Sequence, residues 1–263
     1  VFVRGGTYEL PAALQFGPED SGISTAPVTY RAYPGEKPLL VGARRITGFR
    51  PYKGQILQAS LQDTPLAKTV FRQLFFRGER MIMARCPNVD PSDPHGGKWE
   101  HVAAVDGDQV RDHFTAMPGI VKDWTKVSYA EVGIFPQHDW AWNLLRVKSA
   151  DKAEGTITLA GKTSYDMRVG DRYFVQNLLE ELDAPGEWYL DRDTATLYFW
   201  PPADVNTGEV LAAVMDNVVV IRGARYVNLR GFTVEACDGD AVVLDGCERC
   251  EVAQCTIRNC GSW

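Results

Sequence analysis

The pattern of apolar and polar positions repeats in the last part of the chain. Residues 219–234 align with residues 242–257 at an offset of 23 residues, and nearly all residues between the apolar positions are polar or small. Short alternating strands with this period are typical of a solenoid, in which each coil buries its inner face against a neighbour. The repeat predicts a right-handed parallel β-helix. Its equivalent apolar pairs are Val219 and Val242, Ile221 and Leu244, Val227 and Cys250, Leu229 and Val252, Phe232 and Cys255, and Val234 and Ile257.

The pattern also indicates that the repeat begins early and is interrupted. The segment Gly42–Ile46 resembles the glycine-marked corner at Gly223–Val227, so Gly42 is interpreted as the same corner. We therefore expect the repeat to stop near Gly48 and to resume near Val218. Residues 1–48 are therefore interpreted as the first coils. They contain strand-like runs at residues 1–3, 28–31 and 39–41, separated by glycine and proline turns.

Between the two parts the pattern changes to longer hairpins. Residues 144–147 are expected to pair with residues 156–159, and residues 188–190 with residues 197–200. Only residues 59–76 suggest a short helix. The sequence thus predicts an all-β chain: the first coils of a β-helix at residues 1–48, an inserted antiparallel β-sandwich or barrel-like domain at residues 49–211, and resumed coils at residues 212–263.

The ends of the chain and its charge limit the kinds of partner. The chain begins at Val1 in a strand-like run and stops at Trp263 in a new coil, so we expect both ends to be cut. An open coil would be covered by further β-helix coils or by self-association. The net charge of −6 and scattered basic residues argue against nucleic acid, and no apolar run is long enough for a membrane span.

Five of the six cysteines lie within residues 237–260. The pair at Cys247 and Cys250 has no second matching pair, and the register places Cys250 on an inward position, so a zinc site is not expected. Cys237 and Cys260 are one repeat apart and should stack on neighbouring coils as reduced thiols. A disulfide or a bound metal remains an alternative for this pair.

Acidic residues gather where the repeated segment turns. Asp238 and Asp240 flank Gly239, and Asp245 follows the next strand. These carboxylates are candidates for acid/base chemistry or substrate binding; no cofactor is expected, although calcium is left open. The alternative is structural, because Asp-Gly-Asp is good turn chemistry and Asp245 lies one repeat from Arg222, where it can form a charge pair between coils.

A second candidate site lies within the expected inserted domain. His138, Trp140 and Trp142 concentrate polar and aromatic groups that can hydrogen-bond sugar hydroxyls and stack on sugar rings. The alternative is that both tryptophans share one face of a strand and pack in the core. Three other histidines are spaced too irregularly for a metal site: His95, His101 and His113.

Several short sequence segments, and the order in which they occur, resemble those of bacterial carbohydrate-active β-helix proteins. These proteins belong to the pectate-lyase-like superfamily, and the resemblance is closest to glycoside hydrolase family 141. The segments are Phe2–Tyr8, Phe71–Phe75 with Gly78–Arg80, Glu187–Asp191 with Leu197–Tyr198, and Arg225–Phe232. The resemblance implies an extracellular or periplasmic enzyme that degrades a polysaccharide. It also implies an acidic catalytic pair on later coils, so it assigns no catalytic residue here.

The first hypothesis is accordingly the N-terminal part of a secreted glycoside hydrolase that uses two carboxylates. One alternative is a polysaccharide lyase or epimerase on the same fold, which would need a basic residue and a group that neutralises a uronate. Another is a non-catalytic carbohydrate-binding or adhesin-type β-helix. No serine nucleophile elbow, phosphate loop or dinucleotide fingerprint is present in the sequence.

Overall fold

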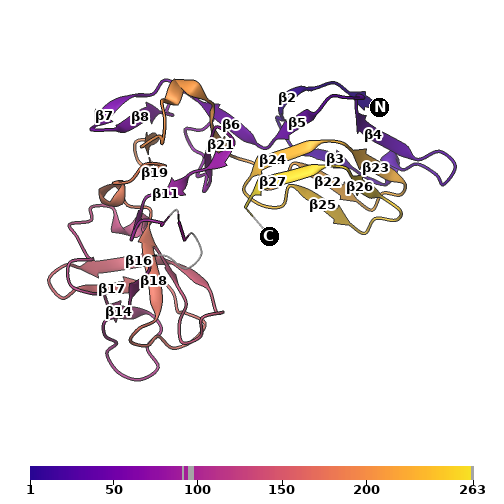
Figure 1. Cartoon of the computed structure of the whole chain (residues 1–263). Coiled ribbons are helices and arrows are strands. Elements are labelled where there is room, and N and C mark those ends of the chain that lie inside the picture. The colour runs from indigo at the N-terminus through magenta and orange to yellow at the C-terminus, as the bar shows by residue number, and fades with distance from the viewer. Residues whose placement is uncertain (91, 94–97, 262–263) are drawn as a thin grey trace. The chain divides into compact units, whose positions relative to one another are not determined.

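The computed structural model describes residues 1–90, 92–93 and 98–261, and it is all-β (Figure 1). The chain forms two compact units. The first unit comprises Val1–Phe49, Ala59–Met81 and Ala203–Trp263, and the second comprises Arg50–Gln58 and Ile82–Pro202. The expected insertion had different limits: residues 59–81 and 203–211 group with the first unit. The helical elements described are 3-10 turns at Pro18–Asp20 (η1), Val127–Tyr129 (η2), Leu179–Glu181 (η3) and Val205–Thr207 (η4).

Three parallel sheets make up most of the first unit as described, and each pass of the chain visits them in the same order. The first parallel sheet contains β1 (Phe2–Val3), β4 (Val28–Ala32), β23 (Val227–Arg230) and β26 (Glu251–Ala253). The second contains β2 (Gly6–Glu9), β5 (Pro38–Val41), β24 (Thr233–Cys237) and β27 (Thr256–Cys260). The third contains β3 (Leu14–Phe16), β22 (Val219–Arg222) and β25 (Val242–Asp245).

The pairing register of these sheets has the offset that the sequence repeat predicts. Val219 pairs with Val242, and Cys237 pairs with Cys260, each 23 residues apart. The inward side chains of the earlier repeat are buried, as at Ile221, whereas the equivalent Leu244 is 49% exposed. Apart from Leu244 and Ile257, the aligned apolar positions belong to a common core between the sheets.

The interpretation of Gly42 as a corner equivalent to Gly223 is wrong. Because Leu40 of β5 pairs with Val234 of β24, Gly42 lies level with Ala236. Gly223 has a φ of +66°, which suits glycine at a corner, whereas a side chain at Gly42 would meet the Ala236 carbonyl oxygen at 3.0 Å. Close packing, and not a corner, explains this glycine.

A short antiparallel sheet stands where the chain leaves and rejoins the parallel strands. Its order is β10-β9-β21-β6, and Ala43 of β6 lies opposite Ala213 of β21. The helix suggested for residues 59–76 is absent from this described segment, which contains turns and then β9. The strands are β6 (Ala43–Ile46), β9 (Leu74–Phe76), β10 (Glu79–Arg80) and β21 (Val210–Ala213).

The second unit contains two further sheets. The predicted hairpin of residues 188–190 with 197–200 is confirmed, since Trp188 pairs with Phe199. The other hairpin forms with a different register, because residues 156–159 pair with Val147 and residues 149–151, whereas residues 144–146 pair with residues 131–133. One sheet has the order β11-β19-β20-β8-β7, from Ile82–Met83, Glu187–Asp191, Thr196–Phe199, Ile56–Ser60 and Arg50–Lys53. The other has the order β12-β18-β15-β16-β17-β14, from Arg85–Cys86, Arg172–Gln176, Glu131–Ile134, Asn143–Asp151, Thr156–Leu159 and His113–Thr115; β13 (Glu100–His101) also pairs with β18.

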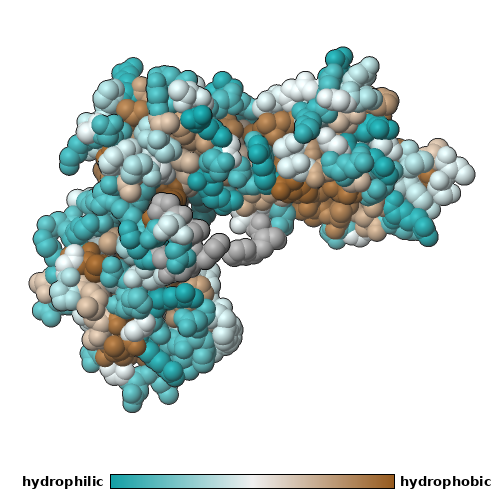
Figure 2. Space-filling model, in the orientation of Figure 1, coloured by the Kyte–Doolittle hydropathy of each residue, from teal (hydrophilic) through white to brown (hydrophobic). Residues whose placement is uncertain are grey.

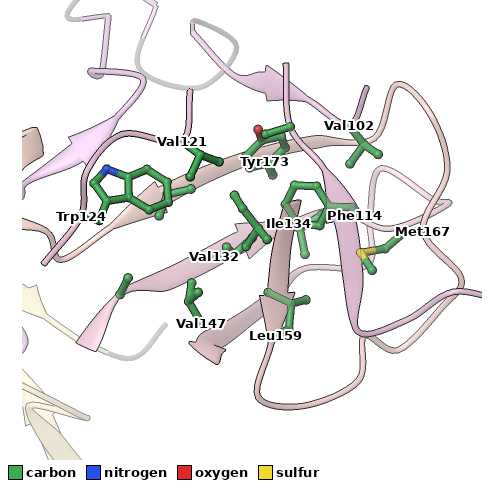
Figure 3. Packing of buried hydrophobic residues seen from close by; sticks show 14 of the residues in the cluster. Val102, Phe114, Val121, Trp124, Val132, Ile134, Val147, Leu159, Met167 and Tyr173 are labelled. Atoms are coloured by element: carbon green, nitrogen blue, oxygen red, sulfur yellow. The ribbon is translucent and has the colours of Figure 1, made fainter. Parts of the chain in front are cut away.

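The second of these sheets closes on itself around a core. Residues 100–104 link its two sides, because Glu100 pairs with Tyr173 of β18 and Ala104 bridges to Thr115 of β14. Apolar side chains point into the enclosed space, including Val132, Ile134 and Phe114 (Figure 3). The alternation of partly buried and fully buried residues along β17 follows from this arrangement.

Candidate functional site

The acidic turn after β24 stacks on the equivalent turn of the preceding repeat. The backbone N–H of Asp238 donates to the Met215 carbonyl oxygen at 2.8 Å, and that of Gly239 donates to the Asp216 carbonyl oxygen at 3.0 Å. Asp216 therefore occupies the position of Gly239 one repeat earlier, since 239 − 216 = 23. Stacking thus adds a carboxylate to the predicted cluster.

The two carboxylates on these turns lie in different environments. Asp238 is half-buried, and this burial raises the pKa of its carboxyl group above the ordinary value. The negative charge of Asp216 raises it further, while hydrogen bonds from Gln73 and the Arg72 backbone act in the opposite direction. Asp216 itself is exposed. A protonatable acid beside an exposed carboxylate is an arrangement suited to acid/base chemistry.

Gln73, directly before β9, positions the half-buried acid. Its side chain is buried, and its Nε2 donates to the Cys237 carbonyl oxygen at 2.9 Å and to Oδ1 of Asp238 at 3.3 Å. No sequence pattern indicates this contact, because Gln73 and Asp238 are 165 positions apart. Asp216 was also missed, although applying the 23-residue offset backwards from Gly239 would have found it.

A shallow cavity of about 350 Å³ adjoins Asp216 on the outward side of β22. Because Val219 and Ile221 are buried, the alternating residues Val220 and Arg222 face this cavity. Its volume is within the range of small-molecule sites. The lining residues are Ala13, Gln15, Met215, Asp216, Asn217, Val220 and Arg222.

The other predicted acids take different places. The carboxylate of Asp245 pairs with Arg222 of the preceding coil at 3.0 Å, and both side chains are exposed. This confirms the charge pair expected between coils, which engages Asp245 away from the acidic turn. Asp240 is exposed two residues beyond Asp238.

The aromatic candidates lie in the second unit, and the expectation that Trp140 and Trp142 share one face of a strand is wrong. Residues 137–140 form a bend and turn, because Gln137 has a φ of +59° and β16 begins only at Asn143. The Trp140 side chain is 72% exposed and stacks on the His138 ring at 5.7 Å between centroids. The ring of Tyr165 meets Trp140 edge-on at 5.5 Å.

Trp142 instead packs against its own unit. Its ring lies 5.0 Å from the Phe135 ring and 5.6 Å from the Phe174 ring, measured between centroids. The absence of a side chain at Gly133 makes room for it, since a Cβ there would lie 2.2 Å from the indole. The two tryptophans therefore have different roles: Trp140 presents a ring to solvent, whereas Trp142 covers part of the unit.

Replacing each tryptophan by alanine should separate these roles. We expect Trp142→Ala to lower the free energy of unfolding of the second unit by about 2 kcal/mol, because aromatic packing is lost. Trp140→Ala should change it by less than about 0.5 kcal/mol, as for most exposed positions. Urea denaturation followed by fluorescence tests this, and equal losses in the two variants would contradict the assignment.

The cysteines and histidines form no metal-binding group in the described part of the chain. All six cysteines are free, and burial raises the pKa of the Cys237 thiol to about 12. His95 lies outside the described residues, while His101 and His113 lie on β13 and β14. Among the described residues, no helix has the length and apolar character needed to cross a membrane.

Comparison with known proteins supports the fold. A solved structure described as "Glycoside hydrolase" has a TM-score of 0.72 and 23% identity, covering 90% of this chain and 43% of that one. A structure titled "The complex structure of XylC with xylose" has a TM-score of 0.42 and 16% identity, covering 90% of this chain and 30% of that one, too weak a likeness to use. No protein-family model and no curated protein matches the sequence. The chain thus has a glycoside hydrolase-like fold and spans less than half of the first structure.

Proposed function

We propose that this chain is part of a secreted bacterial glycoside hydrolase that acts on a polysaccharide outside the cell or in the periplasm. In this proposal the three parallel sheets are the coils of a right-handed β-helix, and the second unit is its inserted β-domain. The likeness to a structure described as a glycoside hydrolase supports the fold part of the proposal. The activity rests on the residues of the acidic turns.

The observation that carries the proposal is the half-buried Asp238 beside the exposed Asp216. Glycoside hydrolysis uses one protonated carboxyl group, which donates a proton to the leaving oxygen, and one ionised carboxylate, which acts as base or nucleophile. Burial favours the protonated form of Asp238, and Asp216 supplies the second, solvent-exposed carboxylate. The cavity beside Asp216 offers space for a sugar ring.

The full-length natural protein provides the direct test. Incubation with plant and algal polysaccharides should release reducing ends without absorbance near 235 nm, because hydrolysis forms no double bond. Absorbance together with reducing ends would indicate a lyase instead. Binding without either signal would favour a non-catalytic carbohydrate-binding protein, a function with which the exposed ring of Trp140 is also compatible.

Variants of the full-length protein test the two roles separately. Asp238→Asn should lower kcat/KM on a polysaccharide by about 10²- to 10⁴-fold, since a general acid is lost. It should retain far more activity on an aryl glycoside whose leaving group needs no proton. Asp216→Asn should abolish activity on both substrates.

Glu248→Gln is the matched control, because this carboxylate is exposed and paired with Arg225 at 3.1 Å, and neither residue lines the cavity. We expect it to change kcat/KM by less than about twofold, the effect of a surface ion pair. Full activity of both Asp216→Asn and Asp238→Asn would place the catalytic residues elsewhere and remove the assignment of roles.

A further inference from the structure

A larger cavity of about 560 Å³ lies wholly within the second unit, away from the residues considered above. The β7–β8 hairpin forms one wall, the η3 turn forms another, and Trp200 follows β20 at its base. Gly54, with a φ of +58°, allows the tight hairpin turn. The lining residues are Tyr52, Lys53, Gly54, Gln55, Ile56, Leu179, Glu180, Leu182, Asp183 and Trp200.

The floor of this cavity is apolar and aromatic. Ile56, Leu179 and Trp200 are partly buried and pack on a small core that includes Leu182. Tyr52 stands at the edge of the cavity, where its ring meets Tyr198 edge-on at 4.7 Å and remains 45% exposed. The rigid floor therefore presents aromatic surface to whatever enters.

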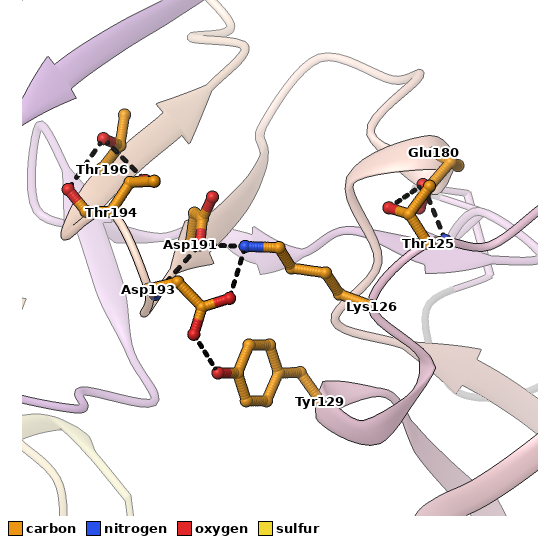
Figure 4. Close-up of polar contacts among 8 residues, drawn as sticks. All are labelled: Thr125, Lys126, Tyr129, Glu180, Asp191, Asp193, Thr194 and Thr196. Atoms are coloured by element: carbon orange, nitrogen blue, oxygen red, sulfur yellow. Dashed lines mark hydrogen bonds and ion pairs between the residues drawn. The ribbon is translucent and has the colours of Figure 1, made fainter.

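The rim of the cavity carries carboxylates that are already held in place. Oε1 of Glu180 accepts hydrogen bonds from the backbone N–H of Thr125 at 3.0 Å and from its hydroxyl at 2.7 Å (Figure 4). Oδ1 of Asp183 accepts from Nδ2 of Asn88 at 2.9 Å. Within the described residues, these contacts leave the second oxygen of each carboxylate free to accept a hydrogen bond from a ligand.

The opposite rim is basic and polar. Lys53 and Gln55 are exposed on the hairpin, and within the described chain Lys53 forms no ion pair. An anionic ligand would be repelled by Glu180 and Asp183, which outnumber Lys53, whereas a cationic one would be attracted by these carboxylates and repelled only by Lys53. A wholly apolar ligand would bury these charges without partners. The lining best suits a neutral ligand with one apolar face and several hydroxyl groups.

We propose that this cavity binds one or two pyranose rings of a neutral glycan. The C–H face of a pyranose stacks on Tyr52 and the apolar floor, and its hydroxyls donate to the free carboxylate oxygens of Glu180 and Asp183. The volume is within the roughly 300 to 1,000 Å³ of small-molecule sites. The inference goes beyond hydrolysis, because a binding site here stands whether or not the acidic turn is catalytic.

Calorimetry on the 263-residue chain tests the site with cellotriose, xylotriose and mannotriose as neutral probes. A glucosamine trimer and a trigalacturonate serve as cationic and anionic probes. We expect at least one neutral trimer to bind with a Kd below about 1 mM, the trigalacturonate to bind at least tenfold more weakly, and the glucosamine trimer to bind no more tightly than the best neutral trimer. Tighter binding of a charged trimer, or no binding of any neutral one, would overturn the proposal.

Variants locate the binding. Tyr52→Ala should weaken it at least tenfold and Glu180→Gln three- to tenfold, whereas Tyr33→Ala, an equally exposed aromatic control in the first unit, should change it less than twofold. An unchanged thermal unfolding midpoint of Tyr52→Ala checks its fold, and Tyr52→Phe should keep most of the affinity because the ring remains. Unchanged binding in Tyr52→Ala would contradict the assignment of the glycan-binding site to this cavity. Asp238→Asn should bind normally, which separates this result from the test of hydrolysis.

Discussion

Raising the pH from about 4.5 to above 7 should weaken the second unit by about 3 kcal/mol through the single carboxyl group of Glu187. Its side chain is 1% exposed, and burial raises its pKa from 4.5 to about 7. Three backbone N–H groups, of Arg85, Asp183 and Ala184, donate to it and only partly offset the cost of burial. A shift of this size corresponds to about 3 kcal/mol, at 1.36 kcal/mol per pKa unit.

The sign follows from proton binding. Between pH 4.5 and 7 the folded protein binds a proton at Glu187 that the unfolded chain has released, so this contribution to stability is complete below 4.5 and is lost as the pH rises through 7. Glu187→Gln imitates the protonated acid and cannot ionise, so the variant should lack this part of the pH dependence.

Urea denaturation of both proteins at pH 5, 6, 7 and 8 measures the effect as a difference. Six of the seven tryptophans lie in the second unit, so their fluorescence reports its unfolding. The free energies of unfolding of the natural sequence and of Glu187→Gln should diverge with rising pH, the variant becoming relatively more stable. Parallel curves would show that Glu187 ionises normally in the fold.

Lys126→Met should destabilise the second unit by about 3 kcal/mol at pH 7. The Lys126 ammonium donates to Oδ1 of Asp191 at 2.6 Å and to Oδ2 of Asp193 at 2.7 Å, and Asp193 also accepts from the Tyr129 hydroxyl (Figure 4). Asp191 is 8% exposed. Methionine keeps the length of the side chain but leaves a buried carboxylate without its cation, a loss that typically costs 3–5 kcal/mol when the pair is fully buried.

The pKa of Asp191 supplies a second check on this pair. Burial alone would raise it, but hydrogen bonds from Lys126 and neighbouring groups outweigh burial and lower it below 3.8. The ionised Asp191 carboxylate therefore stabilises the fold above pH 3.8, and this stabilisation is lost as the pH falls through the pKa of Asp191 in the folded protein. The loss of free energy of unfolding caused by Lys126→Met should be smaller at pH 3 than at pH 7. In a double-mutant cycle, Lys126→Met should cause little of this loss in a protein that already carries Asp191→Asn. A cost that stays constant with pH and persists in Asp191→Asn would argue for lost packing of the lysine stem.

The register of the parallel sheets could be predicted because in a stacked coil the sequence period and the spatial repeat are the same. Counting 23 residues along the sequence from Val219 gives its pairing partner, Val242, so the pairing can be predicted without knowing which distant segments meet. The hairpins were predictable for a similar reason, since their strands are joined by short turns. Gly42 shows the limit of this logic, because three matching letters suggested a corner that the pairing of β5 with β24 excludes.

The sites were less accessible to sequence reasoning because they join distant segments. Gln73 meets Asp238 across 165 residues, and the larger cavity combines a hairpin near residue 54, a turn near residue 180 and Trp200. No period or motif connects these positions. The difference in exposure between Trp140 and Trp142 could not be predicted from the sequence either. It depends on the turn at residues 137–140 and on the space that Gly133 leaves for the Trp142 ring.

The pairing of β4 with β23 has a consequence for synthesis. Val28 pairs with Val227, so β4 leaves the ribosome 227 − 28 = 199 residues before its partner is made. At roughly 5 to 20 residues per second, one edge of the β1–β4 pair stays unoccupied for about 10 to 40 s. Figure 2 shows both polar and apolar side chains over the visible face of the first unit, but side chains of either kind do not occupy the backbone hydrogen-bonding groups of a nascent strand. Translation speed through residues 50–202 therefore sets how long these early strands are open to pairing with another nascent chain on the same messenger.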